Sequence, residues 1–197
     1  MHSGSLPSRT DEELVRLALD GNMRAYNTLV YRFRGAVVLV AEQIVHSHEV
    51  AEDVAQEVFL VAAKSLPRLR DPKRFASWLY AITRYRAHRA RKQAQRTLPM
   101  EPELLHVVVA QLSAQEAAHP EKALLLGEYR NELTAALATL KPELRLVLLL
   151  RYKEAWPVAR ICEFFALPLT TIQGRLHQAR KQLKQQLLAP QKEFEHE

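Results

Sequence analysis

The sequence predicts an all-α protein with two helical domains joined by a flexible linker, the C-terminal domain containing a helix-turn-helix. Apolar residues recur at helical spacing along most of the 197 residues. Residues that favour helix dominate, and only 5 glycines are present. Three prolines and weak periodicity separate the two periodic regions. We therefore expect domains at 10–96 and 123–188, with a linker at 97–122.

The first two helices are marked by their ends. Thr10 and Glu13 have the spacing of a capping box, in which each side chain accepts a hydrogen bond from the other residue's amide. The apolar stripe that follows stops at Gly21, a residue typical of a helix C-terminus. Apolar side chains on one broad face then predict a second helix over 23–45.

The third and fourth helices are separated by a short loop. Ser47 can cap a third helix, which runs to about Ser65 and is ended by Pro67. After the loop PRLRDPKR, we expect a fourth helix from about Arg74 to Gln95. Its inward residues are predicted to be Phe75, Trp78, Leu79 and Ile82. These helices complete the N-terminal domain.

The C-terminal domain is expected to contain four helices. The first runs over 123–140, and Pro142 begins the second. Pro157 fits the first turn of a short third helix, VARICEFF. After a turn at 166–169, Thr170 can cap a last helix that ends near Leu188. Two helices with so short a break are typical of a helix-turn-helix.

Charge divides the N-terminal domain into two parts. The stretch EVAEDVAQEVFL carries four acids and no basic residue. Residues 68–96 then carry ten lysines and arginines against one acid, whereas the whole chain has a net charge of +6. Aromatic side chains lie among these basic residues, and together they suit phosphates and unpaired bases. The acidic stretch is better suited to docking a protein.

The last helix has one apolar side and one polar side. Ile172, Leu176, Ala179 and Leu183 follow helical spacing and are expected to be buried. We expect the other side to read duplex DNA, as the recognition helix of a helix-turn-helix does. The alternative is an ordinary solvated face of a basic helix. The residues on this polar side and its flanks are Thr170, Thr171, Gln173, Gly174, Arg175, His177, Gln178 and Lys181.

Several classes of protein are not supported. A single cysteine, Cys162, excludes an internal disulfide framework. His46 and His48 lack a nearby third metal ligand and are expected to be solvated turn residues. The sequence shows no nucleophile–base set and no glycine-rich phosphate loop, so we expect no enzyme, cofactor or metal site. Without a membrane-spanning run or a signal peptide, we expect a cytoplasmic protein with no membrane insertion.

The chain resembles the extracytoplasmic-function (group 4) sigma factors of bacterial RNA polymerase, over about 11–95 and 123–188. In the N-terminal domain the resemblance rests on Ala25-Tyr26, on the run AEDVAQEVF and on Trp78-Leu79. In the C-terminal domain it rests on further matching residues in the family's order, namely Leu140, Pro142, Arg145, Leu150-Arg151-Tyr152, Glu154, Ile161, Pro168, Thr171-Ile172, Arg175-Leu176 and Ala179-Arg180.

The resemblance implies a role for each segment. Asp53, Gln56 and Glu57 would dock on core RNA polymerase, whose contacts in this family are the coiled coil of the largest subunit and the flap. Residues 170–181 would read the promoter −35 element. The loop after the third helix and the fourth helix would open the −10 element and hold its single strand. The residues expected there are Arg68, Arg70, Lys73, Arg74, Trp78, Arg84, Tyr85 and Arg89, although the spacing of Trp78 favours a core position.

Four residues depart from the family pattern. The family usually has Asn at the position of Tyr85, Asp at that of Arg89 and Gly at that of Ala166. Gly174, where Ser is frequent, weakens its helix by about 1 kcal/mol relative to Ala. An anti-sigma factor is a frequent partner in the family, and the sequence does not indicate one here. The competing interpretation is a stand-alone helix-turn-helix regulator, which leaves the N-terminal domain without a task.

Overall fold

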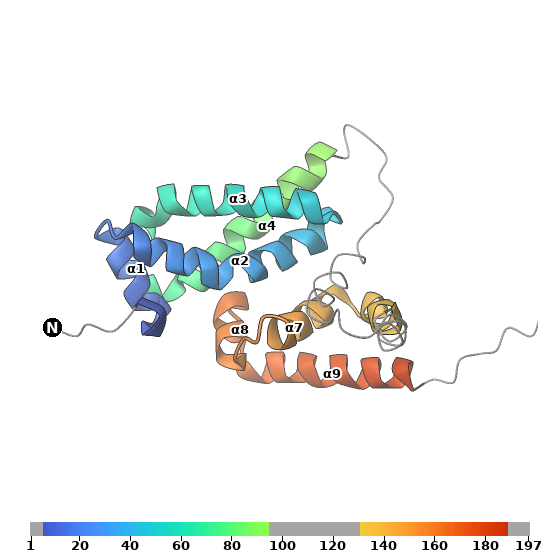
Figure 1. Ribbon diagram of the computed structural model, residues 1–197. Helices are drawn as coiled ribbons and strands as arrows, with labels where there is room; N and C mark the ends of the chain where they lie inside the picture. Colours follow the sequence, from blue (N-terminus) through green and yellow to red (C-terminus); the bar gives the residue numbers. More distant parts are fainter. Residues whose placement is uncertain (1–5, 95–130, 189–197) are drawn as a thin grey trace, which may run out of the picture.

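The computed structural model describes residues 6–94 and 131–188, and within these ranges it contains helices and no strand (Figure 1). The predicted all-α class with two helical domains is confirmed. The linker expected at 97–122 lies outside the described residues. None of the described helices is both long and apolar enough to cross a membrane.

Four α-helices form the N-terminal domain. A short 3-10 helix, η1 (Leu6–Ser8), precedes them, and two more, η2 (Leu66–Arg68) and η3 (Pro72–Arg74), form the loop before the last one. The α-helices are α1 (Asp11–Leu19), α2 (Met23–Val45), α3 (His48–Ser65) and α4 (Phe75–Ala94). The long helices α2, α3 and α4 pack against one another, and α1 covers one end of α2.

Local sequence signals set the ends of these helices. The Thr10 hydroxyl accepts a hydrogen bond from the Glu13 amide at 3.2 Å, and the Glu13 carboxylate accepts one from the Thr10 amide at 2.8 Å. Ser47 likewise caps α3. Gly21 has φ +87°, a conformation that residues with a Cβ rarely adopt. The predicted capping box, cap and stop signal are therefore confirmed.

The C-terminal domain contains helical residues 131–139 and three further helices. These are α7 (Pro142–Tyr152), α8 (Val158–Phe165) and α9 (Leu169–Leu187). Pro142 begins α7 as predicted, whereas the predicted cap of the last helix is wrong. Helix α9 starts one residue before Thr170, and Pro168 occupies the cap position without a side-chain hydrogen bond. The fixed extended backbone of Pro168 starts the helix there, so Thr170 lies inside its first turn.

The two domains share one continuous core. Helix α8 packs against α4, and α7 contacts α2 (Figure 1). The Phe33 ring of α2 lies between the Phe75 ring of α4 and Trp156, with ring centroids 5.4 and 5.5 Å away. Phe33 and Phe164 are fully buried, although they come from different domains. Sequence periodicity did not predict this contact.

Candidate nucleic-acid and polymerase interfaces

The loop between α3 and α4 turns a row of basic side chains outward. Leu66 is buried and Leu69 is half-buried, which fixes the loop to the domain. The Asp71 carboxylate accepts a hydrogen bond from the Lys73 amide at 3.0 Å and caps η3. With the apolar residues turned inward, the predicted −10 residues of the loop are all exposed, namely Arg68, Arg70, Lys73 and Arg74.

Helix α4 continues this basic surface. Arg84, Tyr85 and Arg89 are exposed, as expected for residues that contact nucleic acid. Tyr85 is 66% exposed, and the Arg86 guanidinium lies 5.9 Å from the centre of its ring. Exposed aromatic rings beside arginines can stack on unpaired bases. Loop and helix together therefore form one basic, partly aromatic surface.

Trp78 lies at the border between this surface and the core. Its ring packs on Phe75 with centroids 6.0 Å apart, and the side chain is half-buried. It also lines a surface hollow of about 410 Å³ together with Arg70 and Arg74. Trp78 thus has a packing role and also offers an accessible edge beside two of the predicted DNA-binding arginines.

Helix α3 exposes the predicted polymerase-docking face. Asp53, Gln56 and Glu57 are all exposed on it, one turn apart. Glu57 is already paired, because its carboxylate accepts a hydrogen bond from the Arg86 guanidinium at 2.5 Å. No ion pair to Asp53 occurs between described residues, so its charge is available to a partner.

Beside Gln56, α2 and α3 enclose an apolar hollow of about 440 Å³ that the sequence did not predict. Met23 and Leu60 line it while remaining 66% and 64% exposed. Leu60 could have been found from the sequence, because it follows Gln56 by four residues and lies outside the apolar stripe of α3. Met23 could not have been found in this way. It is the first residue of α2, and sequence periodicity does not show which face of α2 packs against α3. An exposed apolar hollow on the same helix face as an available acidic side chain, Asp53, is typical of a protein-docking site.

Tyr26 fixes the floor of this hollow. Its hydroxyl donates a hydrogen bond to the Phe59 carbonyl at 2.5 Å, which ties α2 to α3. Burial raises the pKa of the Tyr26 hydroxyl to about 12. The side chain therefore stays neutral and acts as a structural link between the two helices.

Helix α9, the predicted recognition helix, has the buried apolar side and the exposed polar side that its sequence predicts. Ile172, Leu176 and Ala179 are buried, and Leu183 is half-buried. The turn before this helix depends on Ala166, which has the left-handed angles φ 51° and ψ 44°. Glycine adopts this conformation most easily, which explains why the family usually has glycine at this position. Of the predicted −35 residues, Thr171 and Arg175 are half-buried, and the exposed ones are Thr170, Gln173, Gly174, His177, Gln178 and Lys181.

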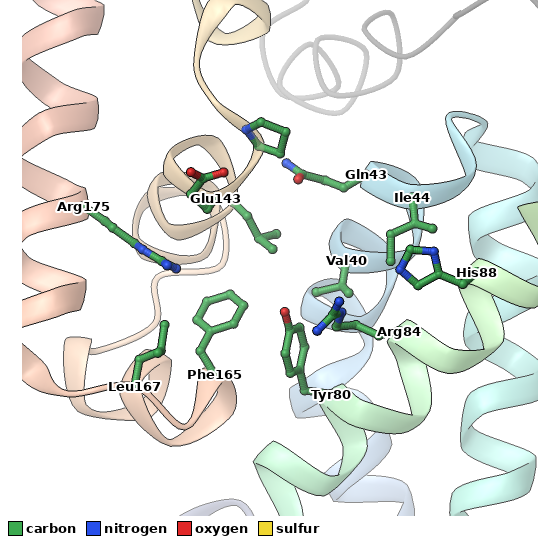
Figure 2. A pocket seen from close by; sticks show the side chains of 12 residues that line it. Val40, Gln43, Ile44, Tyr80, Arg84, His88, Glu143, Phe165, Leu167 and Arg175 are labelled. Atoms are coloured by element: carbon green, nitrogen blue, oxygen red, sulfur yellow. The ribbon is translucent and has the colours of Figure 1, made fainter.

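An open cleft separates α9 from the N-terminal domain (Figure 2). Its volume is about 570 Å³. Arg175 points into it from α9, whereas Tyr80, Arg84 and His88 point into it from α4. Residues predicted to contact different promoter elements thus line the same cleft, an arrangement that the sequence did not predict.

The histidine and cysteine side chains of the described residues can be compared with the expectations from the sequence. Across the described residues, no group of three or more His, Cys, Asp and Glu side chains is placed to hold a metal ion. Cys162 is a free, half-buried thiol, and burial raises its pKa. The expectation that His48 is a solvated turn residue is wrong. It is the first residue of α3 and is half-buried, with its ring nitrogens 3.6 Å from Glu42 and 3.7 Å from Glu52.

Two family models match the chain, Sigma-70 region 2 over residues 29–97 and Sigma-70 region 4 over residues 130–183. The chain is also 27% identical over 178 residues to the ECF RNA polymerase sigma-E factor of Escherichia coli (strain K12), covering 87% of this chain and 91% of that protein. The chain belongs to the extracytoplasmic-function sigma factors. In this sigma factor, helices α3 and α4 lie within the residues matched to region 2, and helices α7 and α8 lie within the residues matched to region 4.

Other relatives agree with this sigma-factor family. The chain is 30% identical over 188 residues to the probable RNA polymerase sigma factor RfaY of Xanthomonas campestris pv. campestris. That match covers 95% of this chain but only 46% of RfaY, so the chain spans about half of that protein's length. Among solved structures, the fold is similar to the sigma factor RpoE in complex with the anti-sigma factor NepR from Bartonella quintana. The TM-score is 0.54 at 19% identity, covering 84% of this chain and 98% of that one.

Proposed function

We propose that this sigma factor binds core RNA polymerase and directs promoter-specific initiation by recognising −35 and −10 elements and assisting DNA melting. The observation that carries the proposal is the presence of three distinct surfaces on one chain. These are the acidic and apolar face of α3, the basic aromatic surface of α4 with its loop, and the polar side of α9. The first suits a protein partner, and the other two suit single-stranded and duplex DNA, so together they match the tasks of initiation.

Each surface is assigned one task. We assign polymerase docking and −10 opening to residues 10–96 and −35 reading to residues 123–188, with 97–122 as the connection between them. On α3, the docking site includes Asp53, Gln56 and Glu57 together with the adjacent apolar hollow. Leu60 would contribute buried apolar area, and Asp53 would supply a charge that steers a basic partner surface.

On the DNA side, the two surfaces read the promoter in different ways. The N-terminal turns of α9 would enter a major groove, where Gln173 and Arg175 can contact base edges. The loop and α4 would hold a single strand through phosphate contacts and base stacking, with Tyr85 as an exposed stacking ring. Neither task requires a metal or a catalytic side chain.

Co-elution with purified core RNA polymerase tests polymerase docking. Asp53→Arg places a like charge against a basic partner surface, and we expect binding to weaken by several kcal/mol if the contact is close. Lys64→Glu is the control, because Lys64 is an exposed charge at the far end of the same helix. We expect the control to co-elute like the wild type.

Circular dichroism and duplex binding complete this test. Asp53→Arg should keep its helicity, and its non-specific duplex affinity should hold or rise because the domain becomes more basic. If Asp53→Arg assembles with core polymerase as tightly as the control does, the docking site on α3 is wrong. If the wild type itself does not co-elute with core polymerase, the proposed function is wrong.

A further inference from the structure

The cleft between α4 and α9 has the size of a small-molecule site. Its volume of about 570 Å³ falls within the roughly 300–1,000 Å³ that is usual for ligand pockets. Side chains of α2, α4, α7, α8 and α9 line it, so its walls come from several directions (Figure 2). Val40 and Leu146 are buried in these walls and make part of them apolar. Apolar walls with a few convergent polar groups are typical of a ligand-binding site.

Two arginines point into this cleft from opposite sides, Arg84 from α4 and Arg175 from α9 (Figure 2). No ion pair between described residues involves either side chain. Among the described lining residues, Glu143 is the single acidic one, so the cleft carries more positive than negative charge. A guanidinium donates paired hydrogen bonds that match the oxygens of a phosphate. The two arginines therefore suit a phosphorylated ligand.

The helices that line the cleft carry further positive charge close to it. His46, Arg91 and Arg145 each lie within three residues of a lining residue, at the end of α2, on α4 and on α7. Burial lowers the pKa of the His46 imidazole, and the charges of Arg91 and Arg145 add to this shift. The Arg145 Nε is buried and has no hydrogen-bond partner among the described residues. An anion in the cleft would therefore be attracted by more positive groups than the two arginines that line it.

Aromatic rings lie beside the arginines in the cleft. The Phe165 ring of α8 and the Tyr80 ring of α4 both line it and are half-buried, with ring centroids 5.1 Å apart. The Arg84 guanidinium lies 5.8 Å from the centre of the Tyr80 ring. A planar base can pack against such rings while its phosphates reach the arginines. The amide nitrogen of Gln43, also at the cleft, is buried without a hydrogen-bond partner among the described residues, so it is available to donate to the ligand.

We propose that this cleft binds a nucleotide that is free in solution, with its phosphates on Arg84 and Arg175 and its base against Phe165 and Tyr80. The site goes beyond the proposed function, which concerns DNA and polymerase. Both arginines are also assigned to promoter DNA, so a bound nucleotide would compete with DNA for them, a consequence that rests on the proposed function. We therefore expect saturating nucleotide, at constant ionic strength, to weaken duplex binding by the free protein. Unchanged duplex affinity would contradict this consequence.

Calorimetric titration of the full-length protein tests the site. The probes are ADP and GDP, with pyrophosphate as the phosphate without a base and adenosine as a base without phosphates. We expect at least one of the two nucleotides to bind about tenfold or more tightly than pyrophosphate and adenosine, because each fragment lacks half of the contacts. If neither nucleotide binds, or if pyrophosphate binds as tightly as the nucleotides do, the proposal is overturned.

Matched removals of positive charge locate the site on the protein. Arg84→Gln and Arg175→Gln should each weaken nucleotide binding by about tenfold or more, because each removes charged hydrogen bonds to phosphate. Lys92→Gln and Lys184→Gln remove the same charge from exposed positions of α4 and α9 that do not line the cleft, and both should bind the nucleotide as the wild type does. Equal loss of affinity in all four variants would show that the nucleotide binds the basic surface in general, and the cleft site would be wrong.

Phe165→Leu distinguishes a free nucleotide from a nucleotide of a DNA strand, which offers the same base and phosphate. The variant loses the ring but keeps an apolar side chain, so nucleotide binding should weaken by about tenfold. Unchanged binding of pyrophosphate would show that the variant is folded, and its affinity for single-stranded oligothymidylate should also be unchanged. Equal loss of nucleotide and strand binding, or no loss of nucleotide binding, would overturn the proposal. Failure of the wild type to co-elute with core polymerase would instead contradict the proposed function and leave these nucleotide affinities unaffected.

Discussion

Ala166 is one of three described residues other than glycine that have a positive φ, the others being His46 and Ala155. A left-handed conformation costs a residue with a Cβ roughly 1–2 kcal/mol, and glycine avoids that cost while losing more entropy on folding. We therefore expect Ala166→Gly to raise the free energy of unfolding by about 0.5–1 kcal/mol in urea titrations. Ala159→Gly, at an exposed position inside α8, is the matched control and should lower it by about 1 kcal/mol. Equal destabilisation by both would contradict the backbone explanation.

Tyr26 leads to a second prediction at the scale of a residue, which concerns how the free energy of unfolding depends on pH. The folded-state pKa of its hydroxyl is raised to about 12 from 10.0, so the folded state retains a proton that the unfolded state loses. Stability from this group is therefore complete below pH 10 and is lost as the pH rises toward 12. We expect the unfolding free energy of the wild type to fall more steeply over this interval than that of Tyr26→Phe. Parallel slopes in denaturant titrations would show that Tyr26 is not buried as described.

At the scale of the elements, α9 makes the clearest prediction. Gln173 is exposed on the first turns, and Lys181 lies two turns further along. Gln173→Ala should weaken binding to the preferred −35 duplex by about 1–3 kcal/mol and relax specificity at one base pair. Lys181→Ala should weaken binding to all duplexes alike and reduce the salt slope by about 1.

Fluorescence anisotropy over a range of salt concentrations separates these two effects. Gln185→Ala is the control, because Gln185 is exposed near the end of the same helix, beyond the turns that would enter the groove. The assignment of α9 would be wrong if all three variants bound matched and mismatched duplexes as the wild type does.

Helix positions were predicted well where the signals are local. The capping box of Thr10 and Glu13, the Ser47 cap and the Pro142 start each involve residues within one turn, so their sequence spacing describes their geometry. The Thr170 cap failed because Pro168 offers a competing start. The exposed charges of α3 and α4 followed from periodicity. The apolar hollow beside Gln56 did not, because it depends on how α2 packs against α3.

At the scale of the whole molecule, the sequence did not predict that the two domains touch. Phe33 of the N-terminal domain contacts Trp156 and Phe164 of the C-terminal domain, and sequence periodicity cannot show that residues of different domains share a core. Arg160 belongs to the short helix VARICEFF, and its sequence position does not indicate a partner in the other domain. Its partner Asp11 is 149 positions away, and only the folded chain brings the two together.

The central claim is that this chain gives core RNA polymerase promoter specificity. Transcription of fragmented genomic DNA by purified core, with and without the protein, followed by sequencing of the RNA 5′ ends, tests it most directly. We predict new start sites that share two upstream elements, and weaker use of the distal element by the Gln173→Ala variant. Start sites that are unchanged by adding the protein, or that share no common element, would contradict the claim.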